Sequence, residues 1–235
     1  MVVDVCFSPV LYPKYHCAES IVVITDIFRA TSTIIAAFEN GVRSIRPVAT
    51  TQEAEDFKAK GFLVGAERNC RRCGFADFGN SPFDYRKDIV DGKDIVFTTT
   101  NGTKAIHYAQ SACRIIVGAF VNLQVVADTC IQEQRDVVVL CAGWEDKINI
   151  EDTLFGGALV ELLQSHGFQT GGDAALIALT LWQNAKTNLP AYVSRTEHYQ
   201  RLADNGLEDN VPYCLTLNPS NLVPFYSTTE KCIII

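Results

Sequence analysis

The chain has 235 residues, of which 48% are hydrophobic, enough for one large globular domain or two small ones. Its net charge of -7 and its pI near 5.1 argue against nucleic acid as the main partner, because binding the phosphate backbone needs a basic face. No stretch approaches the roughly 18 apolar residues of a membrane span, and residues 1–4 lack the basic start of a signal peptide, so we expect a cytoplasmic protein with no membrane partner.

Short apolar runs alternate with helical patterns through the first half of the chain. The run 21–25 is a continuous apolar stretch, as expected for a strand covered on both faces, and it ends at Asp26. Ile34, Ile35 and Phe38 follow at helical spacing. The other predictions for this half are strands at 2–7, 42–48 and 62–65, a loop at 8–20, a surface helix at 51–60 and an aperiodic segment at 69–82.

The stretch 94–109 joins a strand to a helix through a polar turn. The β-branched and aromatic residues at 95–99 predict a buried strand, and Asn101-Gly102 is a turn pair that tolerates positive φ. Apolar residues at helical spacing follow at once. The free N–H groups and the dipole of such a first helical turn favour an anion, although an ordinary joint with Asn or Thr as N-cap is the alternative.

The second half continues the alternation of strands and helices. We predict strands at 114–117 and 136–141, helices starting near 123 and at 151, a buried Ala-rich helix at 174–182, and edge strands at 213–217 and 231–235. Such alternation predicts an α/β fold, a three-layer α/β/α sandwich with a largely parallel or mixed sheet. With no linker or internal repeat in the sequence, we expect one compact domain over residues 1–235.

Five predicted strands end in polar turns, at 26–29, 67–68, 98–103, 118–122 and 141–152. If the strands are parallel, these turns converge beyond the carboxyl ends of the sheet, where α/β folds bind ligands. The turns carry carboxylates, which suit a hard cation such as Mg²⁺. They also carry arginines and helix starts, which suit a phosphate or another acidic group.

Familiar phosphate-handling motifs are absent from the sequence. It contains neither a P-loop nor a G-x-G-x-x-G pattern. An Asp-x-Asp phosphoaspartate site would need an acid where Phe28 stands, and a cysteine-phosphatase loop from Cys141 would need an arginine where Lys147 stands. The remaining chemistry is metal-assisted hydrolysis, in which a cation and a carboxylate activate water.

Nine cysteines, an odd number spread through apparent core segments, indicate reduced thiols rather than a disulfide framework. Cys70 and Cys73 form a C-x-x-C motif, but no second pair follows at zinc spacing. Cys141 fits a small core residue. His198 lies in a polar segment, so we expect it to be exposed to solvent.

The segment 26–33, Asp-Ile-Phe-Arg-Ala-Thr-Ser-Thr, resembles the D-[VIL]-[LF]-R-A-[TS]-[ST]-T signature of the 2-phosphosulfolactate phosphatase family. Three further segments agree in the same order, namely 74–82, 98–103 and Cys141-Ala142-Gly143 followed by Glu151-Asp152. The resemblance spans roughly residues 4–224 and implies a Mg²⁺-dependent phosphatase that converts 2-phospho-3-sulfolactate, or a similar 2-phospho acid, to 3-sulfolactate and phosphate. In the family this step belongs to coenzyme M biosynthesis.

The segment 69–73, Asn-Cys-Arg-Arg-Cys, departs from the family pattern, which is usually glycine-rich there. Extra arginines close to the site could change which second anionic group of a substrate is recognised.

Three acidic positions are the candidates for metal binding: Asp26, Glu151 and Asp152. Asp26 and Asp152 are also candidate catalytic residues, together with Glu67 as a base that orients water. The structural alternatives are an N-cap for Asp26, dipole compensation at a helix start for Glu151 or Asp152, and pairing with Arg68 for Glu67.

The candidate substrate-binding residues are arginines and neutral donors. Guanidinium groups bind phosphate or sulfonate in a bidentate manner, and hydroxyl, amide and backbone N–H groups add neutral hydrogen bonds. The set is Arg29, Arg68, Asn80, Ser81, Thr100, Asn101, Gly102 and Thr103.

These residues lead to the hypothesis of a cytoplasmic Mg²⁺-dependent phosphomonoesterase whose partner is a small anionic phosphorylated substrate. The alternative is a non-catalytic binding module for a small anionic phosphometabolite, which needs the helix starts but no carboxylate cluster. A thiol-redox sensor using Cys70 and Cys73 is a third hypothesis. A homo-oligomer is compatible with all three.

Overall fold

The computed structural model describes residues 1–15 and 18–235. In this part of the chain one 11-stranded sheet has the order β5-β4-β6-β3-β11-β10-β7-β2-β8-β1-β9. The strands are β1 Val2–Cys6, β2 Ile21–Thr25, β3 Ser44–Pro47, β4 Leu63–Arg68, β5 Arg71–Arg72, β6 Asp94–Thr98, β7 Arg114–Val117, β8 Val137–Cys141, β9 Gln169–Thr170, β10 Phe225–Ser227 and β11 Cys232–Ile234.

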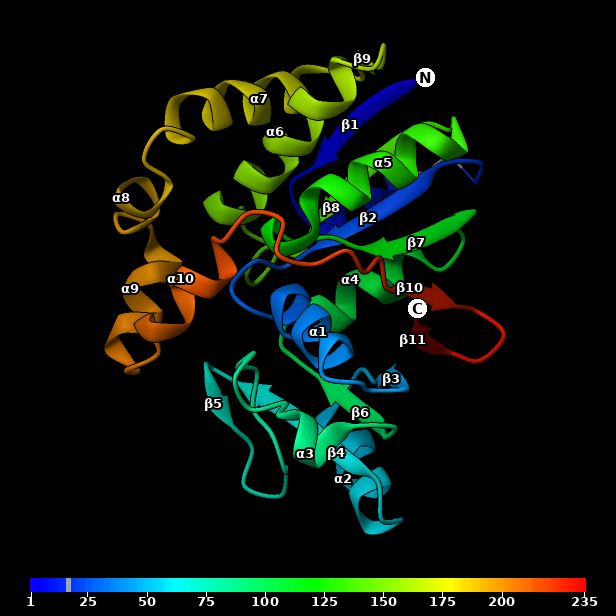
Figure 1. Cartoon of the computed structure of the whole chain (residues 1–235), viewed down its shortest axis with the longest axis vertical. Coiled ribbons are helices and arrows are strands. Elements are labelled where there is room, and N and C mark those ends of the chain that lie inside the picture. Colours follow the sequence, from blue (N-terminus) through cyan, green and yellow to red (C-terminus); the bar gives the residue numbers. More distant parts are fainter. Residues whose placement is uncertain (16–17) are drawn as a thin grey trace.

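The helices lie on both sides of this sheet (Figure 1). They are α1 Ala30–Glu39, α2 Thr51–Ala59, α3 Lys87–Val90, α4 Gly102–Ala109, α5 Leu123–Glu133, α6 Ile150–Gln164, α7 Asp173–Ala185, α8 Leu189–Val193, α9 Glu197–Asp204 and α10 Val211–Cys214, with 3-10 helices η1 Pro9–Lys14, η2 Phe120–Asn122 and η3 Glu208–Asn210. The predicted three-layer α/β fold with a largely parallel, mixed sheet is therefore confirmed.

Two parallel groups of strands make up most of the sheet. β9, β1, β8, β2 and β7 pair in parallel, as do β3, β6 and β4. The antiparallel hairpin β10–β11 lies between the groups and joins each of them through a single residue pair, Phe225 with Ile116 and Ile233 with Ile45. The last strands of the chain therefore complete the centre of the sheet.

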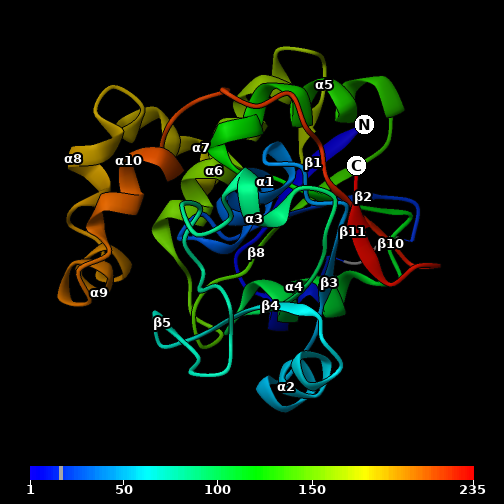
Figure 2. The same ribbon diagram turned by 60° about the horizontal axis from the view of Figure 1, so that its bottom comes forward.

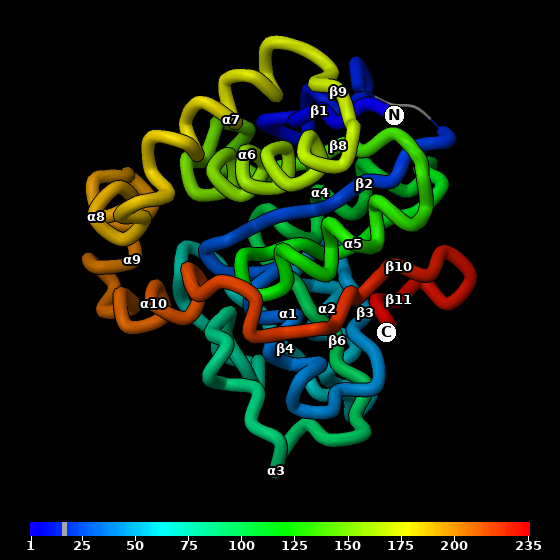
Figure 3. The backbone as a smooth tube through the Cα atoms, turned by 45° about the horizontal axis from the view of Figure 1, so that its top comes forward, coloured from blue at the N-terminus to red at the C-terminus, as the bar shows by residue number. Residues whose placement is uncertain are grey.

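The central strands β2 and β8 are buried along their whole length, which explains their unbroken apolar sequences. On one side η1 and α4 pack against this region, and on the other α6 packs against β1 and β8. Gly156 of α6 leaves room for Val5 and Val139. Gly157 lets α7 approach closely, because a Cβ there would lie 2.0 Å from the carbonyl oxygen of Ala178. Figure 3 shows α6 and α7 side by side.

The segment 189–214, with α8, α9, η3 and α10, forms a separate cluster of short helices, here called the C-terminal lobe. The lobe lies at one end of the molecule in Figures 1 and 2, and the chain then returns across the molecule to β10. No helix in the described residues is both long enough and apolar enough to span a membrane.

Three predictions of local structure are wrong. The expected edge strand at 213–217 is instead covered in part by α10, because Pro212 at the first turn favours helix. The expected loop at 8–20 contains η1, which also starts at a proline, and its residues 16–17 lie outside the described part. The helix predicted at 174–182 exists as α7 but is buried on one face only, since Ala178 and Trp182 are buried whereas the side chains of Leu176 and Ile177 are exposed.

Candidate active site

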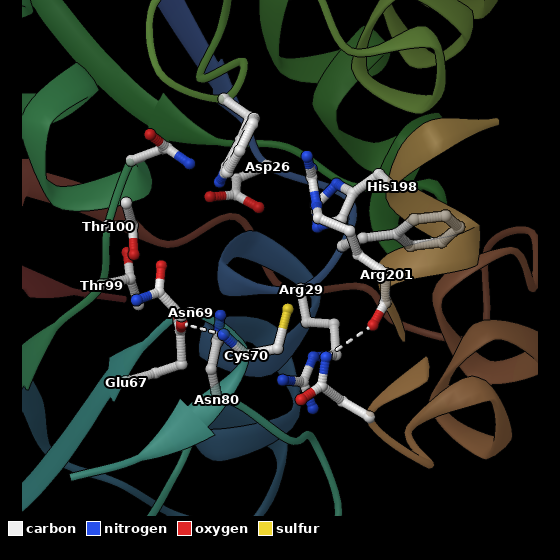
Figure 4. Close-up of a pocket in the computed structure, with 14 residues that line it drawn as sticks. Asp26, Arg29, Glu67, Asn69, Cys70, Asn80, Thr99, Thr100, His198 and Arg201 are labelled. Carbon is white, nitrogen blue, oxygen red and sulfur yellow. Dashed lines mark hydrogen bonds between the residues drawn. The ribbon is translucent and has the colours of Figure 1, made fainter. Parts of the chain in front are cut away.

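A cavity of about 170 Å³ opens between the ends of several strands and the C-terminal lobe (Figure 4). Its walls come from the end of β4, from the segments after β2, β4 and β6, and from α9 with the residue that follows it. Asn80 and Trp144 complete the walls. The lining residues are Asp26, Phe28, Arg29, Glu67, Asn69, Cys70, Asn80, Thr99, Thr100, Asn101, Trp144, His198, Arg201 and Asn205.

Asp26 follows β2 directly and is buried at the edge of the cavity. Asp26 is not the N-cap of α1, because that position belongs to Arg29. Its carboxylate accepts a long hydrogen bond of 3.4 Å from the backbone N–H of Ala30. Burial raises the pKa of Asp26 to about 6, against the opposing effect of the positive charge on His198. A carboxyl with this pKa can exchange a proton near neutral pH.

Asp152 holds two strand ends together from the first turn of α6. Its Oδ1 accepts the backbone N–H of Ile27 at 2.9 Å, and its Oδ2 accepts that of Gly143 at 3.1 Å. Burial, followed by repulsion from Glu151 and Asp26, raises the pKa of Asp152 well above its usual range. Asp152 is thus fully buried behind the cavity and fixes the segments that follow β2 and β8.

His198 is not exposed as predicted, because only 8% of it is accessible to solvent. Its Nδ1 lies 2.5 Å from Oε1 of Glu151, which is itself completely buried. Burial favours the neutral imidazole, but the charge of Glu151 outweighs this and, with Cys70 and Asp26, raises the pKa of His198 to about 10. The ring is therefore an imidazolium at neutral pH.

The polar sequence around His198 suggested exposure because α9 is strongly amphipathic, and the ring lies on its buried face. Glu151 and His198 stand 47 positions apart, so no local pattern connects them. The sequence does carry a weak signal that His198 is buried. His198 and Leu202 stand four positions apart, so they share one face of a short helix whose other faces are charged.

Two arginines reach the cavity from different elements. Arg29 is 3% exposed, and its Nη1 donates to Oδ1 of Asn210 at 3.1 Å. Arg201 comes from α9, and its guanidinium carbon lies 3.7 Å from the ring centroid of Trp144. Neither Nε atom has a hydrogen-bond partner among the described residues, although both are buried.

The hairpin between β4 and β5 brings Glu67 and Cys70 into the cavity. Asn69 and Cys70 both have positive φ, at 53° and 66°, as a tight two-residue turn requires. The backbone N–H of Cys70 donates to Oε1 of Glu67 at 2.6 Å. Arg68 is bonded to the carbonyl oxygen of Glu67 rather than to its carboxylate, so the carboxylate remains at the cavity wall.

Six of the predicted site residues line the cavity: Asp26, Arg29, Glu67, Asn80, Thr100 and Asn101. Gly102 and Thr103 lie just behind it in the first turn of α4, where a Cβ on Gly102 would come within 3.1 Å of Asp26 Oδ2. Arg68 and Ser81 are not brought to the cavity, because Arg68 bonds to Thr98 and the hydroxyl of Ser81 accepts the N–H of Phe83.

Eight lining residues are absent from the predicted site set: Phe28, Asn69, Cys70, Thr99, Trp144, His198, Arg201 and Asn205. Three of them, Trp144, His198 and Arg201, supply an aromatic ring and two cationic groups. All three lie outside the segments that resemble the family signature. His198 and Arg201 enter the cavity from the side opposite Thr99, Asn69 and Glu67 (Figure 4). One wall of the site is therefore rich in carboxylate and hydroxyl groups, and the facing wall is cationic.

Among the described residues, no three His, Cys, Asp or Glu side chains are arranged to hold a metal ion by themselves. Mg²⁺, however, commonly uses one or two carboxylates together with waters and substrate phosphate. Asp26 offers carboxylate oxygens at the cavity wall, and Asp152, just behind it, offers oxygens that also accept backbone N–H groups. Burial raises the pKa of both carboxyl groups, and a bound cation would favour their ionised forms. Glu151 pairs with His198 through Oε1, and its Oε2 is buried without a hydrogen-bond partner among the described residues.

The chain is similar to known proteins along nearly all its length. A family model described as 2-phosphosulpholactate phosphatase matches residues 6–229. A probable 2-phosphosulfolactate phosphatase from Clostridium novyi is 32% identical over 95% of this chain and 96% of its own length. A protein of the same name from Thermotoga maritima is 34% identical, over 94% of each chain. The family resemblance is confirmed, and the chain belongs to the 2-phosphosulpholactate phosphatase family.

Proposed function

We propose that this protein is a Mg²⁺-dependent phosphatase that hydrolyses 2-phospho-3-sulfolactate, or a closely similar 2-phospho acid, to the 2-hydroxy acid and phosphate. One observation carries the proposal. A single cavity presents buried carboxylates on one wall and an arginine–imidazolium set on the other, as a substrate with a phosphoryl group and further acidic groups requires.

The phosphoryl group fits the wall formed by the end of β6 and the start of α4. Thr100 and Asn101 lie at the cavity where the eight-residue helix α4 begins, so backbone N–H groups and the helix dipole favour an anion there. Thr99 Oγ1 and Asn80 Oδ1 are buried without a hydrogen-bond partner in the described residues. Such groups gain stability when a polar ligand reaches them.

Asp26 and Asp152 are the residues that would hold Mg²⁺. When bound, the cation would neutralise charge on the phosphoryl oxygens and make a water molecule more nucleophilic. The cavity is lined by 14 residues from widely separated segments, so the side chains of the protein itself would orient the substrate.

Proton transfer falls to the carboxylates at the cavity wall. Glu67 and Asp26 both lie at the cavity wall, where a carboxylate can accept a proton from an attacking water or return one to the departing alkoxide. Asp152 positions the segments after β2 and β8 through its two backbone hydrogen bonds, so that Asp26 and the loop at Gly143 keep their places.

Release of phosphate from a panel of small phosphomonoesters, assayed with Mg²⁺ and with EDTA, tests the proposal. We expect turnover of 2-phospho acids that EDTA abolishes, and its loss in Asp26→Asn. The matched control is Asp173→Asn, at the exposed start of α7, which should keep full activity. Full activity in EDTA would exclude the metal. Tight binding of the panel without turnover would instead support a non-catalytic binding module.

A further inference from the structure

Arg201 is held in a fixed orientation without being fully engaged. Its guanidinium stacks on the ring of Trp144, with 3.7 Å between the guanidinium carbon and the ring centroid. Stacking of this kind restricts the plane of the group before any ligand arrives. The only ion pair that Arg201 makes within the described residues is a 3.3 Å contact from Nη1 to Glu197, whose side chain is 74% exposed. Such exposed pairs contribute little energy.

The Nε–H group of Arg201 is buried and has no hydrogen-bond partner in the described part of the chain. A buried donor without a partner is unfavourable and points to a ligand that completes it. In a guanidinium, Nε and a neighbouring Nη form the edge that grips an oxyanion through two parallel hydrogen bonds. Arg201 therefore presents an unfilled oxyanion-binding edge at the cavity.

The surroundings of Arg201 are cationic as well. His198 lies three positions earlier on the same face of α9, and its Nδ1 lies 2.5 Å from Oε1 of Glu151. Arg29 lines the same cavity and also has an unpartnered buried Nε. Of the two carboxylates of the cavity, Glu67 lies on the side opposite His198 and Arg201, whereas Asp26 lies close to His198 (Figure 4).

The proposed substrate class carries two acidic groups besides the phosphate. The carboxylate is attached directly to the carbon that bears the phosphate, whereas the sulfonate lies one methylene group farther away. Thr100 and Asn101 at the start of α4 line the same cavity as Arg201, so a group farther from the phosphate than the carboxylate has the longer reach toward the C-terminal lobe. We infer that Arg201, stacked on Trp144, is a specificity residue that binds this second, strongly acidic group of the substrate. The inference rests on the function proposed above.

The arginines at 71 and 72, where the sequence departs from the family pattern, do not serve this purpose. Both are exposed and neither lines the cavity. Arg71 instead donates through Nε to Oδ1 of Asn205 at 3.3 Å, and the amide of Asn205 donates to the carbonyl oxygen of Arg201 at 2.8 Å. Arg71 thus braces the end of α9 from outside, close to Arg201.

Two substrates that differ only in the distal group provide the test. 2-Phosphosulfolactate has the sulfonate, and 2-phospholactate has a hydrogen in its place. For Arg201→Gln we expect KM for 2-phosphosulfolactate to rise about 10- to 100-fold, the loss expected for a hydrogen bond to a charged group. The value of kcat should change less than about 3-fold, because the lost contact is equally strong in the ground state and the transition state. KM for 2-phospholactate should hardly change, because this substrate has no sulfonate.

Two variants serve as controls. Arg195→Gln removes an arginine that also stacks on an aromatic ring, that of Tyr192 at 4.7 Å, but lies outside the cavity, so both KM values should stay unchanged. Arg201→Lys keeps the charge but loses the two-bond edge, so it should give an intermediate KM. An equal rise of KM for both substrates in Arg201→Gln would overturn the inference, because it would indicate general damage to the site.

Binding measured by calorimetry separates this inference from the proposed function. 3-Sulfolactate should bind the wild-type protein more tightly than lactate, and Arg201→Gln should remove that difference. If the protein turns over neither phosphorylated acid but still shows this Arg201-dependent preference, the phosphatase proposal fails and the subsite stands. Turnover of 2-phosphosulfolactate with an unchanged KM in Arg201→Gln would refute the subsite and leave the phosphatase proposal intact.

Discussion

The buried ion pair between Glu151 and His198 should be a major source of stability as well as a part of the site. Glu151 is completely buried, and its Oε1 lies 2.5 Å from His198 Nδ1. In Glu151→Gln the imidazole loses the charge that keeps it protonated in a buried place. Removing one partner of a buried pair costs about 3–5 kcal/mol, a large part of the roughly 5–15 kcal/mol by which domains are stable.

The effect should depend on pH in a defined direction. The pKa of His198 is raised from its ordinary 6.5 to about 10, so the folded protein holds this proton more tightly than the unfolded chain does. The contribution of the pair is therefore complete below pH 6.5 and is lost progressively as the pH rises toward 10. The difference in unfolding free energy between wild type and Glu151→Gln should be largest near pH 6 and should shrink at pH 9.5.

Urea-induced unfolding at pH 6 and at pH 9.5 measures both quantities. The matched control is Glu197→Gln, which makes the same chemical change at an exposed ion pair of α9 and should alter the unfolding free energy by less than about 0.5 kcal/mol. If Glu151→Gln stays within about 1 kcal/mol of wild type at pH 6, or if its deficit grows with pH, the ion-pair reasoning is wrong.

Three further changes test other parts of the site. Asp26→Asn, measured in EDTA at pH 8, should raise the unfolding free energy by about 1–3 kcal/mol. Burial raises the pKa of Asp26 to about 6, so the ionised carboxylate is unfavourable in the folded protein at higher pH. A loss of stability in this variant would contradict the reasoning. Gly102→Ala should lower kcat at least about 10-fold by crowding Asp26 and α1, whereas Gly74→Ala, with open space around it, should not. Alkylation of Cys70 by iodoacetamide should block turnover, because Cys70 lines the cavity, and bound phosphate should slow this alkylation. If activity is lost through alkylation of the exposed Cys113 instead, the assignment of this cavity as the active site is refuted.

The fold could be predicted from the sequence because its strands and helices leave local signals. The fully buried strand β2 reads as an unbroken apolar run, and α6 has apolar residues at helical spacing, although its residues 151–160 are all buried. The order of the strands leaves no such signal. The hairpin β10–β11 lies between β7 and β3 through one residue pair on each side, and nothing local in a three-residue strand predicts a partner from the first fifty residues.

The candidate site divides in the same way. Asp26, Glu67 and Thr100 lie at or just beyond the carboxyl ends of strands, so a parallel sheet was enough to predict that they lie near one another. His198 and Arg201 stand on a short helix in a lobe that the strand pattern does not define. Their place in the site depends on contacts with Glu151 and Trp144, and such contacts exist only after the chain has folded.

The two walls of the cavity differ in what a substitution can change. The carboxylate wall is built on strand ends locked by Asp152, so alterations there disturb the reacting groups themselves. The cationic wall is carried by α9, and Arg201 touches the strand side chiefly through Trp144. A substitution at Arg201 can therefore change which acidic group is recognised while the reacting geometry persists. Glu151 and His198 form a buried ion pair between α6 and α9, so damage to that pair should affect stability, specificity and rate together.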